Sequence, residues 1–406
     1  MTIVRYWISK AAASATTAAI VLAATLSMAA TASLPVQAQA YKEKVIYNFA
    51  GGVDGESPVA GVVRDSAGNF YGATNTGGAN NAGTVFKLSR TGVETVLYTF
   101  TGGADGYLPY AGVILDKSGN LYGTTAFGGA FNSGTIYRVN IATDQETVLH
   151  NFIAGTSTDG SLPYAGLIED TKGNLYGTTL EGGDISCEAG EGCGVVFKLD
   201  TMTSKETLLY TFTGSPDGDR PQASLIRDSQ GNLYGTTSSG GLLNAGAVFE
   251  VNSVTHAESI LYSFTGGNDG KRPLACLVRD TSGNLYGTAS MGGSADSGTV
   301  FEINATGQYS TLYTFTGGTD GQYPYAGLTL DAQGNLYGTT IFGGASSDGV
   351  VFELGKTGVE TVLHTFNGSN GQYPVAALLS DGKGDFYSTT ELGGAHGDGV
   401  VFKLTP

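Results

Sequence analysis

Short apolar runs separated by glycine, asparagine and aspartate follow one another along the chain from residue 43 onward. The segment 109–152 holds four such runs, at 109–116, 121–125, 135–139 and 146–152. They are rich in β-branched and aromatic residues, and each ends at a turn signal. No run in the rest of the chain keeps the 3.6-residue apolar period of a helix. The pattern therefore predicts repeating groups of four antiparallel strands, which we call a, b, c and d.

One phrase recurs seven times and sets the size of the repeating group. Its commonest form is Gly-Asn-Leu-Tyr-Gly-Thr-Thr, and its tyrosine returns every 50 to 58 residues. Four hairpin-linked strands at such a period are typical of β-propeller blades. The seven tyrosines are Tyr71, Tyr122, Tyr176, Tyr234, Tyr286, Tyr337 and Tyr387.

Each end of the chain contributes an incomplete group. A d-type run at 43–49 precedes the first a run, and the last repeat stops after a c-type run at 399–404. Pairing these two runs completes every blade, whereas an open solenoid would leave two unpaired edges. We therefore predict an all-β, seven-bladed β-propeller of four-stranded antiparallel blades, in which residues 43–49 complete the blade formed by 374–404.

Residues 1–40 have the features of a secretory signal peptide. Arg5 and Lys10 precede an alanine-rich apolar stretch, which ends in the A-x-A pattern Ala38-Gln39-Ala40. Serine and threonine interrupt that stretch, which disfavours the alternative of a membrane anchor, and no later run is long enough to span a bilayer. We expect one propeller domain over 41–406, exported to the periplasm or the outside, with no membrane span in the mature chain.

The charge of the mature chain limits its partners. The full chain has a formal charge of -16, and removing two basic residues with the leader changes this to -18 (-16 minus 2). Such acidity argues against nucleic acid and anionic membrane surfaces as partners. The 64 glycines lack the strict triplet of collagen and are expected in turns. We expect a monomer.

Cys187 and Cys193 lie six residues apart in a glycine-rich segment. In an exported protein this spacing favours a disulfide. A metal site would need two more soft ligands nearby, and none is visible in the sequence. We therefore predict a disulfide and no metal site.

The recurring phrases extend over nearly all of residues 43–404. They include Phe-Thr-Gly-Gly-x-Asp-Gly-x-x-Pro, Asp-x-x-Gly-Asn-Leu-Tyr-Gly-Thr-Thr, Gly-Thr-Val-Phe-Lys-Leu and Thr-Gly-x-Glu-Thr-Val-Leu. Together they resemble the GloVer (Gloeo/Verruco-type) tandem-repeat family of exported bacterial proteins. The resemblance implies a propeller-like extracellular protein, often tethered by a C-terminal anchor, and no established activity. This chain ends at Val-Phe-Lys-Leu-Thr-Pro406 without such an anchor, so we expect a freely secreted or periplasmic form.

Alternating strand directions divide the loops between the two faces of the ring. The d–a and b–c loops share one face, which we call the motif face, and the a–b and c–d loops share the opposite face. Six d–a loops carry an Asp-Gly pair, and the seventh carries Asn370. One carboxylate per loop is too few for Ca²⁺, which takes six to eight oxygens, so we predict backbone-binding turns. The aspartates are Asp54, Asp105, Asp159, Asp217, Asp269 and Asp320.

Residues of the motif face that differ between repeats are the candidates for ligand binding, because a residue present in every blade builds the blade. Aromatic platforms with a few basic groups suit sugars or acidic polymers. The alternative is ordinary loop variation without function. The candidates are Arg220, Lys271, Arg272, Tyr107, Tyr323, Tyr373, Phe127, Phe342 and His396.

Catalytic motifs are missing from the sequence, which has no G-x-S-x-G, H-E-x-x-H or P-loop pattern. His150 and His364 replace a strand-d tyrosine and are interpreted as packing substitutes. Glu181, Asp184 and Glu391 could act as glycosidase carboxylates only at separations of about 5–9.5 Å. The leading hypothesis is a non-catalytic binding scaffold, without a cofactor, for a glycan or protein partner. The alternative is a polysaccharide lyase or glycoside hydrolase with its site on the same face.

Overall fold

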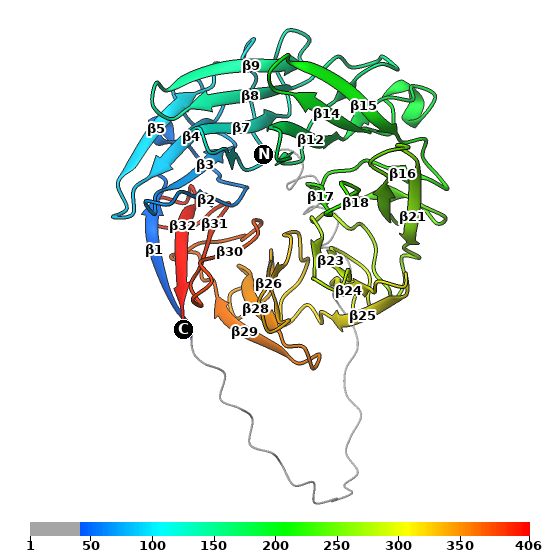
Figure 1. Ribbon diagram of the computed structural model, residues 1–406. Helices are drawn as coiled ribbons and strands as arrows, with labels where there is room; N and C mark the ends of the chain where they lie inside the picture. The colour runs from blue at the N-terminus through cyan, green and yellow to red at the C-terminus, as the bar shows by residue number, and fades with distance from the viewer. Residues whose placement is uncertain (1–40) are drawn as a thin grey trace, which may run out of the picture. The chain divides into compact units, whose positions relative to one another are not determined.

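A computed structural model describes residues 41–406, so the predicted signal peptide at 1–40 lies outside the described residues. The described chain contains seven four-stranded sheets and two short two-stranded ones. The seven larger sheets follow one another around a ring, each with its d strand outermost (Figure 1). This arrangement confirms the predicted seven-bladed propeller.

The blades have the following strands, in the order a to d. Blade 1 has β2 (Val63–Arg64), β3 (Phe70–Thr74), β4 (Thr84–Leu88) and β5 (Glu94–Thr99), and blade 2 has β6 (Ile114–Leu115), β7 (Asn120–Thr125), β8 (Thr135–Asn140) and β9 (Gln145–Asn151). Blade 3 has β11 (Ile168–Glu169), β12 (Asn174–Thr179), β14 (Val195–Asp200) and β15 (Lys205–Thr211), and blade 4 has β17 (Ile226–Arg227), β18 (Leu233–Thr237), β20 (Ala247–Val251) and β21 (Glu258–Ser263).

Blade 5 has β22 (Val278–Arg279), β23 (Leu285–Ala289), β24 (Thr299–Ile303) and β25 (Tyr309–Thr314), and blade 6 has β26 (Thr329–Leu330), β27 (Leu336–Thr340), β28 (Val350–Leu354) and β29 (Glu360–Thr365). Blade 7 has β30 (Leu379–Ser380), β31 (Phe386–Thr390), β32 (Val400–Thr405) and, as its d strand, β1 (Lys42–Asn48). The two short sheets pair β10 (Gly160–Ser161) with β13 (Glu181–Gly182), and β16 (Gly218–Asp219) with β19 (Ser239–Gly240).

The N-terminal strand closes the ring. β1 runs antiparallel to β32, with Lys42 opposite Thr405 and Asn48 opposite Val400 (Figure 1). Phe49, directly after β1, is fully buried and packs edge-on against Phe86 of blade 1, with ring centroids 5.2 Å apart. The first strand of the described chain therefore joins blade 7 to blade 1, as predicted.

An aromatic pair of this kind connects every blade to the next. The phenylalanine after each d strand meets the strand-c aromatic ring of the following blade at 5.0–5.3 Å between centroids. Each such pair adds about 0.5–1.5 kcal/mol beyond its buried area. The same strand-c ring covers the glycine of Leu-Tyr-Gly, where a methyl group on Gly123 would lie 2.4 Å from Tyr137 Oη. The glycine is thus required by a close approach within the blade.

The recurring phrase is a structural element. Its tyrosine hydroxyl donates a hydrogen bond to the aspartate of the a–b turn in six blades, as Tyr71 does to Asp65 at 3.0 Å. The first threonine of Thr-Thr donates to a backbone carbonyl of the next blade, as Thr124 does to Ala165. The second threonine donates within its own b–c loop, as Thr125 does to Phe127. The phrase therefore joins the a–b turn, the b–c loop and the neighbouring blade.

Strand a is shorter than the sequence indicates. The apolar run predicted at 109–116 forms ladder pairs only at Ile114 and Leu115. Pro109 lacks a backbone N–H, and a methyl group on Gly112 would lie 3.0 Å from the Gly61 carbonyl of blade 1. The first half of the run is therefore occupied by contacts with the neighbouring blade. Among residues 41–406, no helix has the length and apolar character needed to cross a membrane.

Candidate binding face

The motif face has the same backbone frame in every blade. The residue after each Asp-Gly or Asn-Gly pair lies opposite the residue before the Gly-Gly of the b–c loop, in antiparallel register. No two of these pairs have the same side chains, so the fold holds the backbone constant while the surface varies. The seven pairs are Glu56–Thr76, Tyr107–Phe127, Ser161–Glu181, Asp219–Ser239, Lys271–Met291, Gln322–Phe342 and Gln372–Leu392.

The next residue in each d–a loop has a left-handed backbone. Its φ lies between 55° and 58° in all seven repeats, although none of these residues is glycine. A side chain in this region is strained by about 1 kcal/mol or more, and glycine would relieve the strain. Four of the nine candidates, Arg220, Arg272, Tyr323 and Tyr373, occupy this position. Tyr107 and Lys271 lie one residue earlier, in the paired position.

A first aromatic cluster consists of Tyr107, Tyr110, Phe127 and Tyr164. Tyr107 stacks on Phe127 with ring centroids 5.4 Å apart, and Phe127 meets Tyr164 edge-on at 6.4 Å. Tyr164 also contacts Tyr110 at 4.7 Å. All four side chains are half-buried, so part of each ring remains accessible. Burial raises the pKa of both Tyr110 and Tyr164, so their hydroxyls stay protonated.

Sequence reasoning missed Tyr110 and Tyr164. Each follows the proline that ends a d–a loop, where the other repeats have valine, glutamine, leucine or tyrosine. Comparing this column between repeats could have identified both residues.

A second aromatic cluster joins three predicted residues. Phe342 contacts Tyr373 at 5.1 Å and Tyr323 at 6.0 Å between ring centroids, both nearly perpendicular. These residues come from three loops, before and within blade 6 and before blade 7. The structure thus brings five of the nine candidates into two aromatic clusters.

The predicted cations are engaged with neighbouring side chains. Arg220 forms an ion pair with Glu188 at 3.3 Å, and Lys271 forms one with Asp296 at 2.9 Å. Arg272 also has an interaction partner. His396 is exposed in the b–c loop of blade 7. The carboxylates of Glu188 and Asp296 therefore neutralise two of the positive charges that were predicted to bind an acidic polymer.

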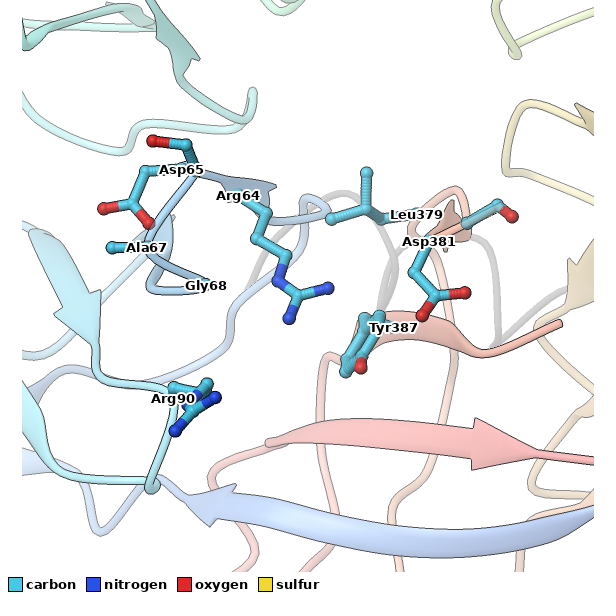
Figure 2. A pocket seen from close by; sticks show the side chains of 10 residues that line it. Arg64, Asp65, Ala67, Gly68, Arg90, Leu379, Asp381 and Tyr387 are labelled. Atoms are coloured by element: carbon cyan, nitrogen blue, oxygen red, sulfur yellow. The ribbon is translucent and has the colours of Figure 1, made fainter. Parts of the chain in front are cut away.

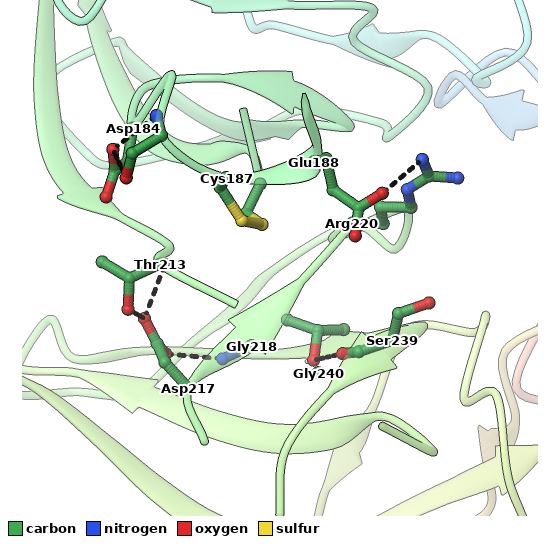
Figure 3. Close-up of a disulfide and its surroundings, with 12 residues drawn as sticks. Asp184, Cys187, Glu188, Thr213, Asp217, Gly218, Arg220, Ser239 and Gly240 are labelled. Carbon is green, nitrogen blue, oxygen red and sulfur yellow. Dashed lines mark hydrogen bonds and ion pairs between the residues drawn. A yellow bond between two sulfur atoms is a disulfide. The ribbon is translucent and has the colours of Figure 1, made fainter. Parts of the chain in front are cut away.

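The predicted disulfide between Cys187 and Cys193 is present in the b–c loop of blade 3. Figure 3 shows this loop beside the ion pair of Arg220 and Glu188. Burial, together with the nearby Glu188, raises the pKa of Asp219 to about 6. The disulfide loop therefore places an acidic group of blade 3 against the d–a loop that enters blade 4.

The carboxylates considered for catalysis have separate surroundings. Burial and the nearby Glu191 raise the pKa of Glu181. Asp184 accepts hydrogen bonds from Ser186 within its own exposed turn, and these bonds lower its pKa. Burial raises the pKa of Glu391, whose Oε2 has no hydrogen-bond partner. Glu181 is thus coupled to Glu191, a residue that sequence reasoning did not single out.

The opposite face of the ring has a pocket of about 500 Å³ where blade 7 meets blade 1. Arg64, Arg90 and Tyr387 line it, and Figure 2 shows the Arg64 guanidinium between Arg90 and the ring of Tyr387. That guanidinium lies 5.3 Å from the ring centroids of Tyr387 and Phe70. A second pocket of about 590 Å³, between blades 5 and 6, includes Arg279 and Lys356. Neither pocket contains any of the nine predicted residues.

These features define the class of the protein, an all-β, seven-bladed propeller with a constant backbone and a variable motif face. The model of the Gloeobacter/Verrucomicrobia repeat matches residues 33–249 and 220–406, and the chain belongs to this family. No curated protein has a sequence that matches this one.

Solved structures with the same fold are distant in sequence. The extracellular domain of a hybrid two-component system from B. thetaiotaomicron is 13% identical with a TM-score of 0.55, and the match covers 90% of this chain and 41% of that one. An oligogalacturonate lyase from Vibrio parahaemolyticus is 11% identical with a TM-score of 0.55, covering 91% and 94%. An oligogalacturonate lyase in complex with manganese is 13% identical with a TM-score of 0.53, covering 86% and 89%. At these identities the likeness concerns the fold alone.

Proposed function

We propose that this protein is an exported, non-catalytic β-propeller that binds a glycan through the aromatic clusters of its motif face. The observation that carries the proposal is the set of seven equivalent backbone pairs with seven different side-chain combinations. At these positions the fold depends on backbone hydrogen bonds, so the side chains can vary and can bind a ligand. The predicted leader supports export, and a similar solved structure is the extracellular domain of a two-component system.

The chemistry of the clusters favours a neutral sugar chain. Half-buried tyrosine and phenylalanine rings present apolar faces to the C–H groups of a sugar, and tyrosine hydroxyls add hydrogen bonds. Gln322, opposite Phe342 in the backbone register, adds an amide donor and acceptor. Arg220 and Lys271 are already paired with carboxylates, which weakens the case for an acidic polymer. A polysaccharide lyase or hydrolase remains the second candidate, supported by the acidic groups around the disulfide loop.

One experiment separates binding from catalysis. The mature chain is offered a panel of neutral and acidic polysaccharides, and retention is measured by affinity electrophoresis and by calorimetry. We expect a neutral polysaccharide to bind and to remain intact. A lyase would instead release unsaturated products that absorb in the ultraviolet, and a hydrolase would release new reducing ends. Either product would overturn the non-catalytic proposal.

Two substitutions locate the site. Phe127→Ala and Phe342→Ala each remove the central ring of one cluster, and we expect at least one to weaken binding about tenfold, since stacking contacts contribute about 1 kcal/mol or more. Val254→Ala, at a side chain 85% exposed in a c–d loop of the opposite face, is the matched control. Circular dichroism verifies that each variant is folded. Unchanged affinity in both phenylalanine variants would contradict the placement on the motif face.

A further inference from the structure

The boundaries between blades carry a repeated polar trio. A strand-d side chain contacts the polar residue of the Asp-Gly or Asn-Gly turn that follows, and a strand-d side chain of the next blade approaches the same turn. Four boundaries have tyrosine, aspartate and glutamate: Tyr47–Asp54–Glu94, Tyr98–Asp105–Glu146, Tyr210–Asp217–Glu258 and Tyr313–Asp320–Glu360. The other three are Tyr262–Asp269–Tyr309, His150–Asp159–Glu206 and His364–Asn370–Glu43.

The boundary between blades 2 and 3 brings together an imidazole and two carboxylates. His150 Nε2 lies 3.2 Å from Asp159 Oδ1, and the side chains are 18% and 8% exposed. One ligand atom from each of His150, Asp159 and Glu206 lies within 4.8 Å of the others. Glu206 Oε1 is buried without a hydrogen-bond partner. These three residues form a compact, largely enclosed set of potential metal ligands.

Other departures from the repeat occur at the same boundary. In four other boundaries a threonine follows the interblade phenylalanine, and its hydroxyl or backbone N–H donates to the aspartate, as Thr101 does to Asp105. Here that residue is Ile153, which donates only its backbone N–H. The turn is also two residues longer, with Asp159 seven residues after Phe152, whereas Asp105 follows Phe100 by five. Asp159 therefore lacks a hydroxyl partner and gains an imidazole.

The spacing suits a small divalent cation. Zn²⁺ binds imidazole nitrogen and carboxylate oxygen at about 2.0–2.2 Å, so tetrahedral ligand atoms lie about 3.3 Å apart. The Nε2–Oδ1 distance of 3.2 Å already matches this spacing, and a carboxylate oxygen of Glu206 lies within 4.8 Å of a ligand atom of His150 and of one of Asp159. Backbone N–H groups of Ile153 and Gly160 hold the Asp159 carboxylate in place, as outer-shell partners do in metal sites.

We propose that His150, Asp159 and Glu206 bind a first-row divalent transition-metal ion, with Zn²⁺ as the best match and an open position for water. Imidazole and carboxylate are both zinc ligands, whereas Ca²⁺ and Mg²⁺ favour oxygen ligands alone. The ion binds the lone pair of Nε2 while the imidazole proton resides on Nδ1. Such an ion joins β9 of blade 2 to β15 of blade 3 through the intervening turn.

The negative charges of the two carboxylates agree with a cation bound between them. Burial and the negative charge of Asp159 raise the pKa of Glu206 to about 7, while His150 acts in the opposite direction. A bound divalent cation relieves this repulsion and favours the ionised carboxylate.

The test uses a variant that the repeat itself provides. His150→Tyr places at this boundary the residue that occupies the equivalent position in five others, so the variant is expected to fold. Chelator-treated wild-type protein is titrated with Zn²⁺ by calorimetry, and with Co²⁺ while its visible absorption is recorded. We expect one equivalent to bind in the wild type, with a rise in melting temperature, and about 100-fold weaker binding in His150→Tyr.

His364→Tyr is the matched control, because His364 faces Asn370 instead of a carboxylate. It should retain one tight equivalent and the wild-type cobalt spectrum. The proposal fails if the wild type binds no stoichiometric metal, if His150→Tyr binds as tightly as the wild type, or if His364→Tyr alone loses the ion.

Discussion

Two blade boundaries carry a histidine where the others carry tyrosine, and the turn residue that the histidine faces differs between them. Between blades 2 and 3, His150 faces the carboxylate of Asp159 at 3.2 Å. Between blades 6 and 7, His364 faces Asn370, whose Nδ2 lies 3.0 Å from Nε2. Burial lowers the pKa of His364 to about 4, so this imidazole is neutral near pH 7. The fold requires a polar contact at this position, and the chemistry of the contact is free to vary.

The two boundaries also differ in how the chain makes them. Blades 2 and 3 are consecutive in sequence, whereas blade 7 takes its Glu43-bearing strand from the other end of the chain. The boundary with Asp159 does not involve the strand that closes the ring. The boundary with Asn370 also depends on β1 remaining paired with β32.

The largest expected effect comes from removing the strand that the second boundary depends on. Deleting residues 41–50 exposes the edge of β32 and removes Phe49, whose burial alone is worth about 3–5 kcal/mol. We expect the free energy of unfolding to fall by more than about 5 kcal/mol, measured by urea denaturation. Removing Thr405 and Pro406 is the control and should change it by less than about 1 kcal/mol. Equal losses in the two truncations would contradict closure by β1.

An exchange of the two turn residues tests the comparison directly. Asp159→Asn should abolish zinc binding, because the amide supplies no negative charge to the ion. Asn370→Asp should raise the number of bound zinc ions from one to two, since it places a carboxylate between His364 and Glu43. Calorimetric stoichiometry measures both effects. If Asn370→Asp bound only one zinc ion, a trio of histidine, aspartate and glutamate would not be sufficient for a zinc site.

The smallest expected effect concerns the boundary between blades 3 and 4, which has the trio of Tyr210, Asp217 and Glu258. Burial and the nearby Asp217 raise the pKa of Glu258 to about 7, above its ordinary value of 4.5. Between these two pH values, the folded state holds a proton on Glu258 that the unfolded state releases. The stabilisation from this proton is complete below pH 4.5 and is lost as the pH rises through about 7. Glu258→Gln removes this dependence.

As the pH rises from 5 to 8, the free energy of unfolding of Glu258→Gln should increase by about 1 kcal/mol relative to that of the wild type. This value allows for the partial exposure of the Glu258 side chain. Urea midpoints across that range measure the difference, with Asp144→Asn in an exposed turn as the control. Parallel pH profiles for the wild type and Glu258→Gln would contradict the assigned role of Glu258.

The candidate site was predictable only in part. Tyr107, Phe127, Tyr323, Phe342 and Tyr373 could be selected because they interrupt a repeated pattern, and the structure places them in two clusters. The acidic partners of Arg220 and Lys271 could not, because Glu188 and Asp296 come from other loops, and only the packing of those loops places each carboxylate beside its cation. The Arg64 pocket was also missed, since it forms only where blade 7 meets blade 1.

The strand pattern of one blade, the number of blades and the closure of the ring could all be predicted from the chain before its fold was known. These follow from short-range patterns, namely strand periodicity, turn residues and a period of 50 to 58 residues. Which variable side chains contact one another could be learned only from the packing of the blades. Glu206 lies 56 residues after His150 in the chain, yet their ligand atoms approach within 4.8 Å. The physical reason is that blade packing, and no local rule, sets distances between strands of different blades.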